Sequence, residues 1–163
     1  MRSHSDLCTS RQNGSVLLES LIAVVIFSIG VLAIVGMQAF AVSASSDAKY
    51  RNDANFLANQ LLGSMWGSDR TQAVLQAAFA SPSGTAYTTW AWGGAASTGT
   101  QTAPAAGTVL GALPGAQANP PTVVITPNAA TTPPSSLVTI TIFWQSPRDQ
   151  APRNHSVVSQ IGG

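Results

Sequence analysis

The stretch Gly14-Ser15-Val16-Leu17-Leu18-Glu19 opens a long apolar segment, and this segment decides the fold of the chain. A run of about 18 or more apolar residues is long enough to form a membrane-spanning helix. We therefore expect a transmembrane helix over residues 17–42. Between Ser15 and Ala44 the only polar side chains are Ser15, Glu19, Ser20, Ser28, Gln38 and Ser43.

Glu19 is the only charged side chain of this segment. A charge at the bilayer centre costs roughly 2.5–3.5 kcal/mol on insertion scales, less near a helix end, and intramembrane carboxylates usually have partners. Ser15 and Glu19 are four residues apart, so on a helix they share a face. If the chain were cut before Ser15, its new α-amino group, with a pKa of about 7.7–8.0, could pair with Glu19 of a neighbouring copy. The alternative is a carboxylate that reaches the headgroups and has no partner.

Charges that flank the segment predict its orientation. Arg2 and Arg11 precede it, whereas the residues that follow it carry charges of both signs. Basic residues accumulate on the cytoplasmic side of membrane helices. We expect a cytoplasmic N-terminus and a C-terminal domain on the other side of the membrane.

An ordinary secretory signal peptide is the alternative interpretation of the N-terminus. Ala39-Phe40-Ala41 offers a cleavage site of the small-x-small type. Cleavage there would release an exported binding module with a mature N-terminus after Ala41 or Ala44. The apolar segment is, however, longer than the usual 7–15 residues of a signal peptide and has a carboxylate near its start.

The junction at Gly14 resembles the class III leader of type IV prepilins and pseudopilins. The resemblance implies that residues 1–14 are a leader, which a prepilin peptidase removes by cutting between Gly14 and Ser15. It also implies N-methylation of Ser15 and a role for Glu19 in setting subunit register during assembly. Many major pilins begin with Phe, so Ser15 at this position favours a minor subunit.

Beyond the membrane segment, apolar residues recur at helical spacing, which predicts an amphipathic continuation over residues 43–66. Gly67-Ser68-Asp69 is a plausible stop. One helix over residues 15–66 would be roughly 78 Å long, so its second half needs a domain to pack against. The periodic residues are Tyr50, Ala54, Leu57, Leu61 and Met65.

Residues 67–163 predict a C-terminal domain with antiparallel strands. We expect a helix over 71–79, a strand over 85–92 with Trp90 and Trp92 on one face, and a low-complexity loop over 93–117. Strands follow at 122–126, 137–144 and 155–161, the last two joined by a turn at 146–149. The fold class is α+β, a long N-terminal helix packed on a small antiparallel sheet.

The C-terminal segment resembles the minor pilins called type IV pilus modification proteins, of the PilV type. The resemblance rests on Phe143-Trp144-Gln145, a polar turn, and a short strand with Val157 and Val158. It implies a type IV pilin-like fold, a single-pass inner-membrane protein that later reaches the pilus or cell surface, and effects on assembly, adhesion or motility. The implied partners are prepilin peptidase, other pilins and inner-membrane lipid. A minor pseudopilin of a type II secretion system has the same junction.

The low charge of the chain makes self-association easier than a strongly charged surface would. Charged residues are 8% of the chain, and loss of residues 1–14 removes two basic and one acidic residue, leaving five of each. Such a surface offers no footprint for nucleic acid. We find no enzyme motif, metal-ligand spacing or cofactor loop, and we expect His155 on the surface and the tryptophans in packing contacts rather than in a ligand platform. Cys8, the only cysteine, lies in the leader, whereas many pilins close a C-terminal loop with a disulfide.

Overall fold

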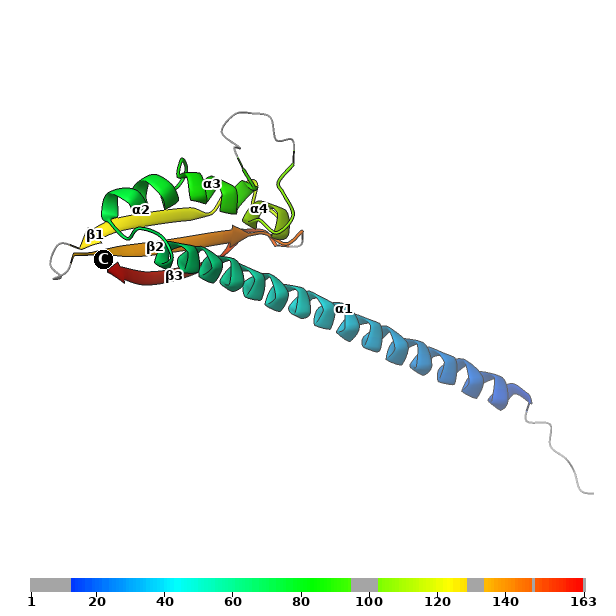
Figure 1. The fold of residues 1–163 in the computed structure, drawn as a ribbon. Coiled ribbons are helices and arrows are strands. Elements are labelled where there is room, and N and C mark those ends of the chain that lie inside the picture. Colours follow the sequence, from blue (N-terminus) through cyan, green and yellow to red (C-terminus); the bar gives the residue numbers. More distant parts are fainter. Residues whose placement is uncertain (1–12, 95–102, 129–133, 148, 163) are drawn as a thin grey trace, which may run out of the picture. The chain divides into compact units, whose positions relative to one another are not determined.

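The computed structural model describes residues 13–94, 103–128, 134–147 and 149–162. The chain divides into two compact units, Met1–Ser45 and Ser46–Gly163, which are described separately below. Long-helix and antiparallel-sheet elements together confirm the α+β class (Figure 1). The elements are α1 (Asn13–Trp66), α2 (Gln72–Phe79), α3 (Thr85–Trp92), α4 (Val109–Ala112), β1 (Thr122–Asn128), β2 (Ser135–Trp144) and β3 (Arg153–Gly162).

In the first unit the described residues are helical throughout, as the apolar run predicts. The helix passes Gly30 and Gly36 without a break. Two of its hydroxyl groups are satisfied by the helix itself, since Ser28 Oγ donates to the carbonyl oxygen of Val24 at 2.7 Å and Ser20 Oγ to that of Leu17 at 2.9 Å. Such bonds to the preceding turn let serine lie in an apolar helix without an unpaired donor.

The second unit contains the C-terminal part of α1, and this part is amphipathic as expected. The helix ends at Trp66, where Gly67 N–H donates to the Gly63 carbonyl at 3.1 Å. The predicted stop at residues 67–69 is confirmed. One stripe of α1 is buried in the core and consists of Ala54, Leu57, Ala58, Leu61, Leu62 and Met65.

The sheet has the order β1-β2-β3, and both pairs are antiparallel. The predicted alternation of β2 is confirmed, because Val138, Ile140, Ile142 and Trp144 are all buried. The residues between them are exposed or half-buried. One face of the sheet therefore closes the hydrophobic core. The predicted third strand is also confirmed and is longer than expected.

β1 runs through Pro127, although we expected the strand to stop before it. Proline cannot donate a ladder hydrogen bond, so it is tolerated where the missing N–H would point away from the partner strand. The backbone of Val123 points away from β2, because its N–H and C=O bond to Ser81. Pro127 lies an even number of residues from Val123, so its backbone also points away from β2 and no ladder hydrogen bond is lost there.

The prediction of a strand at 85–92 is wrong, because these residues form the helix α3. Threonine and the aromatic residues favour strands, but tertiary burial overrides that preference. At helical spacing Tyr87, Trp90 and Ala91 share one face, and all three are buried. Trp90 Nε1 donates to the Leu57 carbonyl of α1 at 3.0 Å. Gly93 ends α3 with φ of +95°, a backbone conformation that glycine adopts without strain.

The prediction that residues 93–117 form one loop is also wrong in its second half; residues 95–102 lie outside the described part. α4 begins at Val109, and the hydroxyl of Thr108 caps it by accepting from Gly111 N–H at 3.3 Å. The many small residues of this segment suggested a loop, although a few larger residues among them are buried. The buried apolar residues of this segment are Val109, Leu110, Leu113 and Ala116.

Tyr87 supplies a test of this core that depends on pH. Its hydroxyl donates to the Pro121 carbonyl at 2.7 Å, and burial raises its pKa above the ordinary 10.0. A pKa that is raised on folding gives stability that is complete below about 10 and is lost as pH rises further. We expect the melting temperature of the second unit to fall above pH 10. Tyr87→Phe should cost about 1 kcal/mol at pH 7 and flatten that fall.

Near-ultraviolet circular dichroism of the full chain in detergent, at pH 7 and pH 11, measures both effects. Tyr50→Phe is the matched control, since Tyr50 is only half-buried. If wild type and Tyr87→Phe lose equal stability between the two pH values, the buried phenol is not the source of the effect.

Candidate functional site

The largest exposed apolar surface lies on α1. Every residue from 15 to 42 is exposed in the structure, including Leu17 at 70%, Phe27 at 72% and Phe40 at 77%. Soluble monomers rarely expose apolar patches larger than a few hundred Å². By length and composition this helix could cross a membrane. Such a surface is suited to contact with lipid or with other helices.

The predicted processing bond lies at the start of this surface. α1 begins at Asn13, so the bond between Gly14 and Ser15 falls within the first helical turn. The first N–H groups of a helix have no intrahelical acceptor, and helix ends fray. The bond therefore lies where unwinding costs least, which suits a site of proteolysis.

Glu19 is one helical turn beyond Ser15, so the two residues share one face of α1, as the sequence predicted. The Glu19 side chain is exposed. It forms no hydrogen bond or ion pair with any residue from 13 onward that the structure describes. Its pairing with a neighbouring amine stays a prediction. Arg2, Cys8 and Arg11 lie outside the described residues.

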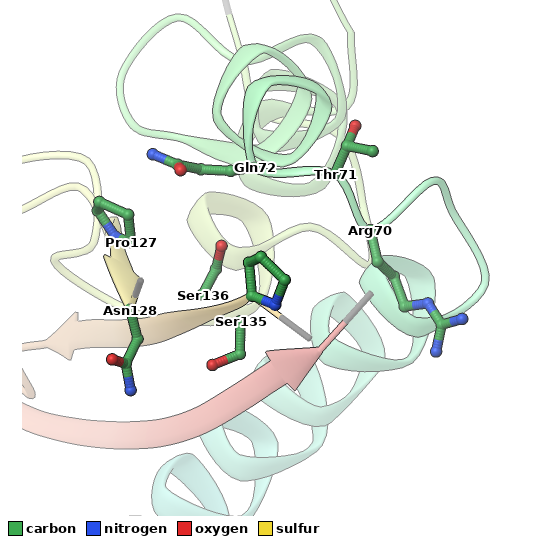
Figure 2. A pocket seen from close by; sticks show the side chains of 8 residues that line it. Arg70, Thr71, Gln72, Pro127, Asn128, Ser135 and Ser136 are labelled. Carbon is green, nitrogen blue, oxygen red and sulfur yellow. The ribbon is translucent and has the colours of Figure 1, made fainter. Parts of the chain in front are cut away.

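A cavity of about 350 Å³ opens where the start of α2 meets the adjoining ends of β1 and β2 (Figure 2). Arg70 is its only charged lining residue, and Figure 2 shows the guanidinium turned away from Ser135 and Ser136. No carboxylate or imidazole lines it. General acid–base chemistry needs a titratable group within reach of a substrate proton. This cavity offers none.

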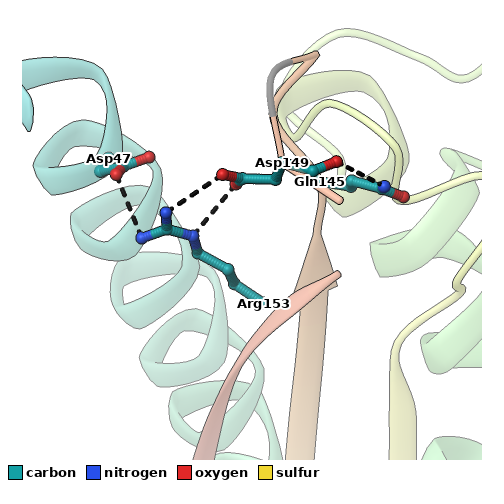
Figure 3. Close-up of polar contacts among 4 residues, drawn as sticks. All are labelled: Asp47, Gln145, Asp149 and Arg153. Carbon is teal, nitrogen blue, oxygen red and sulfur yellow. Dashed lines mark hydrogen bonds and ion pairs between the residues drawn. The ribbon is translucent and has the colours of Figure 1, made fainter. Parts of the chain in front are cut away.

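An ion cluster that the sequence did not predict joins α1 to the turn before β3 (Figure 3). Arg153 bonds to both carboxylate oxygens of Asp149, at 3.0 and 3.1 Å, and lies 3.1 Å from Asp47 on α1. The hydrogen bond and charge of Asp149, together with the charge of Asp47, raise the pKa of Arg153. Gln145 Nε2 holds the same turn through the Asp149 carbonyl. Exposed ion pairs contribute little stability, so the cluster orients the turn.

Two buried polar atoms, Trp144 Nε1 and His155 Nε2, have no hydrogen-bond partner among the described residues. Trp144 is 1% exposed, which confirms a packing role.

The expectation that His155 is a surface residue holds in part, because the residue is half-buried on the face of β3 that also carries Val157 and Ile161. Within the described ranges no three His, Cys, Asp or Glu side chains gather as metal ligands would.

Comparison with known proteins adds no relative: no family model, no curated protein and no solved structure matches this chain. Its fold and surface define it as an α+β protein with a long, exposed, apolar N-terminal helix that is able to span a membrane.

Proposed function

We propose that this chain is a minor pilin of a type IV pilus, made as a prepilin and incorporated into the filament through its N-terminal helix. Prepilin peptidase cuts it between Gly14 and Ser15 and methylates Ser15. The inner membrane holds the helix before assembly, with the C-terminal unit on the periplasmic side. The chain itself performs no catalysis, and it acts on pilus assembly, adhesion or motility.

One observation carries the proposal: the apolar segment of α1, residues 15–42, is exposed at every residue, and its only carboxylate, Glu19, is the fifth residue after Gly14. In a bundle of such helices the exposed side chains become buried, at roughly 25 cal/mol per Å² of apolar area removed from solvent. Lipid already shields this surface before assembly, so packing and pairing set the specificity within the bundle. Glu19 is the side chain that forms this pair in the proposed bundle.

The glycines of this helix favour close packing between subunits. A Cβ added at Gly30 or Gly36 would meet no side chain and no atom of another segment within 4 Å, apart from its own chain neighbours. The helix therefore does not need glycine for its own fold, although glycine costs about 1 kcal/mol relative to alanine inside a helix in water. Small residues in membrane helices permit close approach of neighbours. We infer that the neighbours of this chain are other helices.

The continuity of α1 weighs against the exported-module alternative. That alternative requires cleavage after Ala41 or Ala44, and α1 continues through both positions to Trp66. The same helix then supplies six buried residues to the core of the second unit. A single helix that continues into the folded unit fits a domain that keeps its apolar segment better than a domain that loses this segment by signal-peptide cleavage.

The decisive measurement is the N-terminus of the membrane-extracted protein, read by mass spectrometry in cells that contain a prepilin peptidase. We expect an N-methylated Ser15. An N-terminus after Ala41 or Ala44 would replace the proposal with a secreted domain. Recovery of the chain in sheared pili separates a pilus subunit from the alternative, a minor pseudopilin of a type II secretion system.

A further inference from the structure

The two edges of the sheet differ in how their backbone groups are satisfied. At the β1 edge, Ser81 N–H and Oγ donate to the Val123 carbonyl at 3.1 and 3.2 Å, and Val123 N–H donates to Ser81 Oγ at 3.1 Å. Gln76 Nε2 donates to the Ile125 carbonyl at 3.3 Å. An edge whose outward groups are occupied cannot accept another strand. These bonds, together with Pro127, which has no N–H, leave the β1 edge without the continuous row of free groups that a further strand would need.

These bonds also fix which backbone groups of β3 point outward. Because Val123 points away from β2, the ladder between β1 and β2 runs through Val124 and its partner Thr139. The neighbouring residue Ile140 then points toward β3, where it pairs with Val157. Successive strand residues alternate, so the residues of β3 whose N–H and C=O face away from the sheet are Asn154, Ser156, Val158 and Gln160.

None of these four residues has a backbone hydrogen bond on that side to any part of the chain that the structure describes. Figure 1 shows β2 between β1 and β3, so that β3 forms the border of the sheet. The free row from Asn154 to Gln160 is about 20 Å long at 3.4 Å per residue. It presents donors and acceptors at the spacing that an extended backbone can satisfy in full.

Natural proteins usually protect such an edge with lysine, proline or a bulge. The stretch from Asn154 to Gly162 contains no lysine, proline, arginine or carboxylate. Its register with β2 is continuous over ten pairs, so no bulge interrupts it. Beside the edge, His155 and Val157 are half-buried on one face, and Val158 is 59% exposed on the other. The β3 edge therefore lacks protection, whereas the β1 edge is covered by its bonds to Ser81 and Gln76.

We propose that the free edge of β3 is a docking site for an extended, uncharged segment of a different polypeptide, which adds to the sheet as a fourth strand. The four outward residues bind its backbone, which is the recognition mode of β-strand addition. The only charged side chain of β3 is Arg153, which is already paired with Asp149 and Asp47, so the edge has no free charge to compensate a charged segment that loses water there. Residues of the partner that contact His155 and Val157 are therefore small or apolar.

A second copy of this chain is the less favourable occupant. Its β1 edge lacks a continuous row of free groups, so only its own β3 is available, and an antiparallel pair of β3 strands reverses one copy relative to the other. In the second unit, α1 and β3 run in the same general direction (Figure 1). The two α1 segments would then point in opposite directions, which conflicts with anchoring both copies in one membrane. This step rests on the anchoring of the proposed function, whereas the edge itself does not.

Amide hydrogen exchange of the full chain in detergent, read by NMR, tests the edge first. We expect the amides of Asn154, Ser156, Val158 and Gln160 to exchange at least about tenfold faster than those of the residues between them, because only the latter bond to β2. Equal protection along β3 would overturn the assignment of the edge. Val158→Pro should keep the fold, whereas the matched variant Val157→Pro removes a ladder bond and should unfold the unit.

The occupant is tested with a synthetic probe, an acetylated and amidated peptide that alternates threonine and valine between terminal lysines. We expect it to slow exchange of the four outward amides about tenfold and leave the β1 edge unchanged. The same peptide N-methylated at its central amides should have no effect. No protection by the first peptide overturns the proposal, as does protection that rises with protein concentration alone, which identifies a second copy. The N-terminus of the same sample, read by mass spectrometry, tests the proposed function separately.

Discussion

Gly14→Ala is expected to leave the precursor uncut, with its leader still attached and the whole population in the inner membrane. A Cβ at the residue before the scissile bond prevents the close backbone approach that glycine permits. The expected effect is complete rather than partial, since no other Gly-Ser bond precedes an apolar run with a carboxylate at the fifth position. Mass spectrometry of the membrane fraction distinguishes the precursor from a chain that begins at Ser15.

Gly30→Ala is the matched control for this variant. It makes the same substitution in the same helix, at a position where a Cβ meets no side chain and no other segment within 4 Å, apart from its own chain neighbours. Processing of Gly30→Ala should equal that of the wild type. If Gly14→Ala is also processed normally, the assignment of the junction to prepilin peptidase is wrong.

Glu19→Ala is expected to be processed at the same bond and then to fail in assembly. Removing one partner from a buried ion pair typically costs about 3–5 kcal/mol, because the remaining charge is buried without compensation. At 1.4 kcal/mol for each factor of ten, incorporation should fall by more than about a hundredfold. The measurement is the amount of this chain in sheared pili relative to the amount in the membrane.

Gln38→Ala provides the comparison, because it also replaces an exposed polar residue of the apolar segment with alanine but removes no charge. It should be incorporated like the wild type. Wild-type incorporation of Glu19→Ala would show that the carboxylate has no role in register. A loss of processing in Glu19→Ala would instead place its role at the peptidase.

Periodicity alone predicted much of the architecture. α1 and β2 have strong and unambiguous patterns, a long apolar run followed by helical spacing in one case and strict alternation in the other. β3 was found from its place after a turn. The helix was expected to begin at Ser15, whereas α1 begins at Asn13 and so includes the candidate junction. These features are local, so the neighbouring residues in the sequence are enough to predict the helix or strand.

The errors arise where local preference and tertiary burial disagree. Over the eight residues of α3, Trp90 and Trp92 alternate as in a strand, while Tyr87, Trp90 and Ala91 have helical spacing. Only the bond from Trp90 to the Leu57 carbonyl and the buried face decide between them. In the same way, the contact of Arg153 with Asp47 joins distant parts of the chain. Nothing in the sequence near either residue indicates that pair.

The placement of the tryptophans gives this protein an optical property that separates its two units. All four, at positions 66, 90, 92 and 144, belong to the unit that begins at Ser46, and the apolar helix segment before it has none. Trp90 and Trp144 are buried, whereas Trp66 at the end of α1 is 49% exposed. Intrinsic tryptophan fluorescence therefore reports on the unit that begins at Ser46 and not on the apolar helix segment, and Trp66→Phe removes the contribution of the most exposed tryptophan.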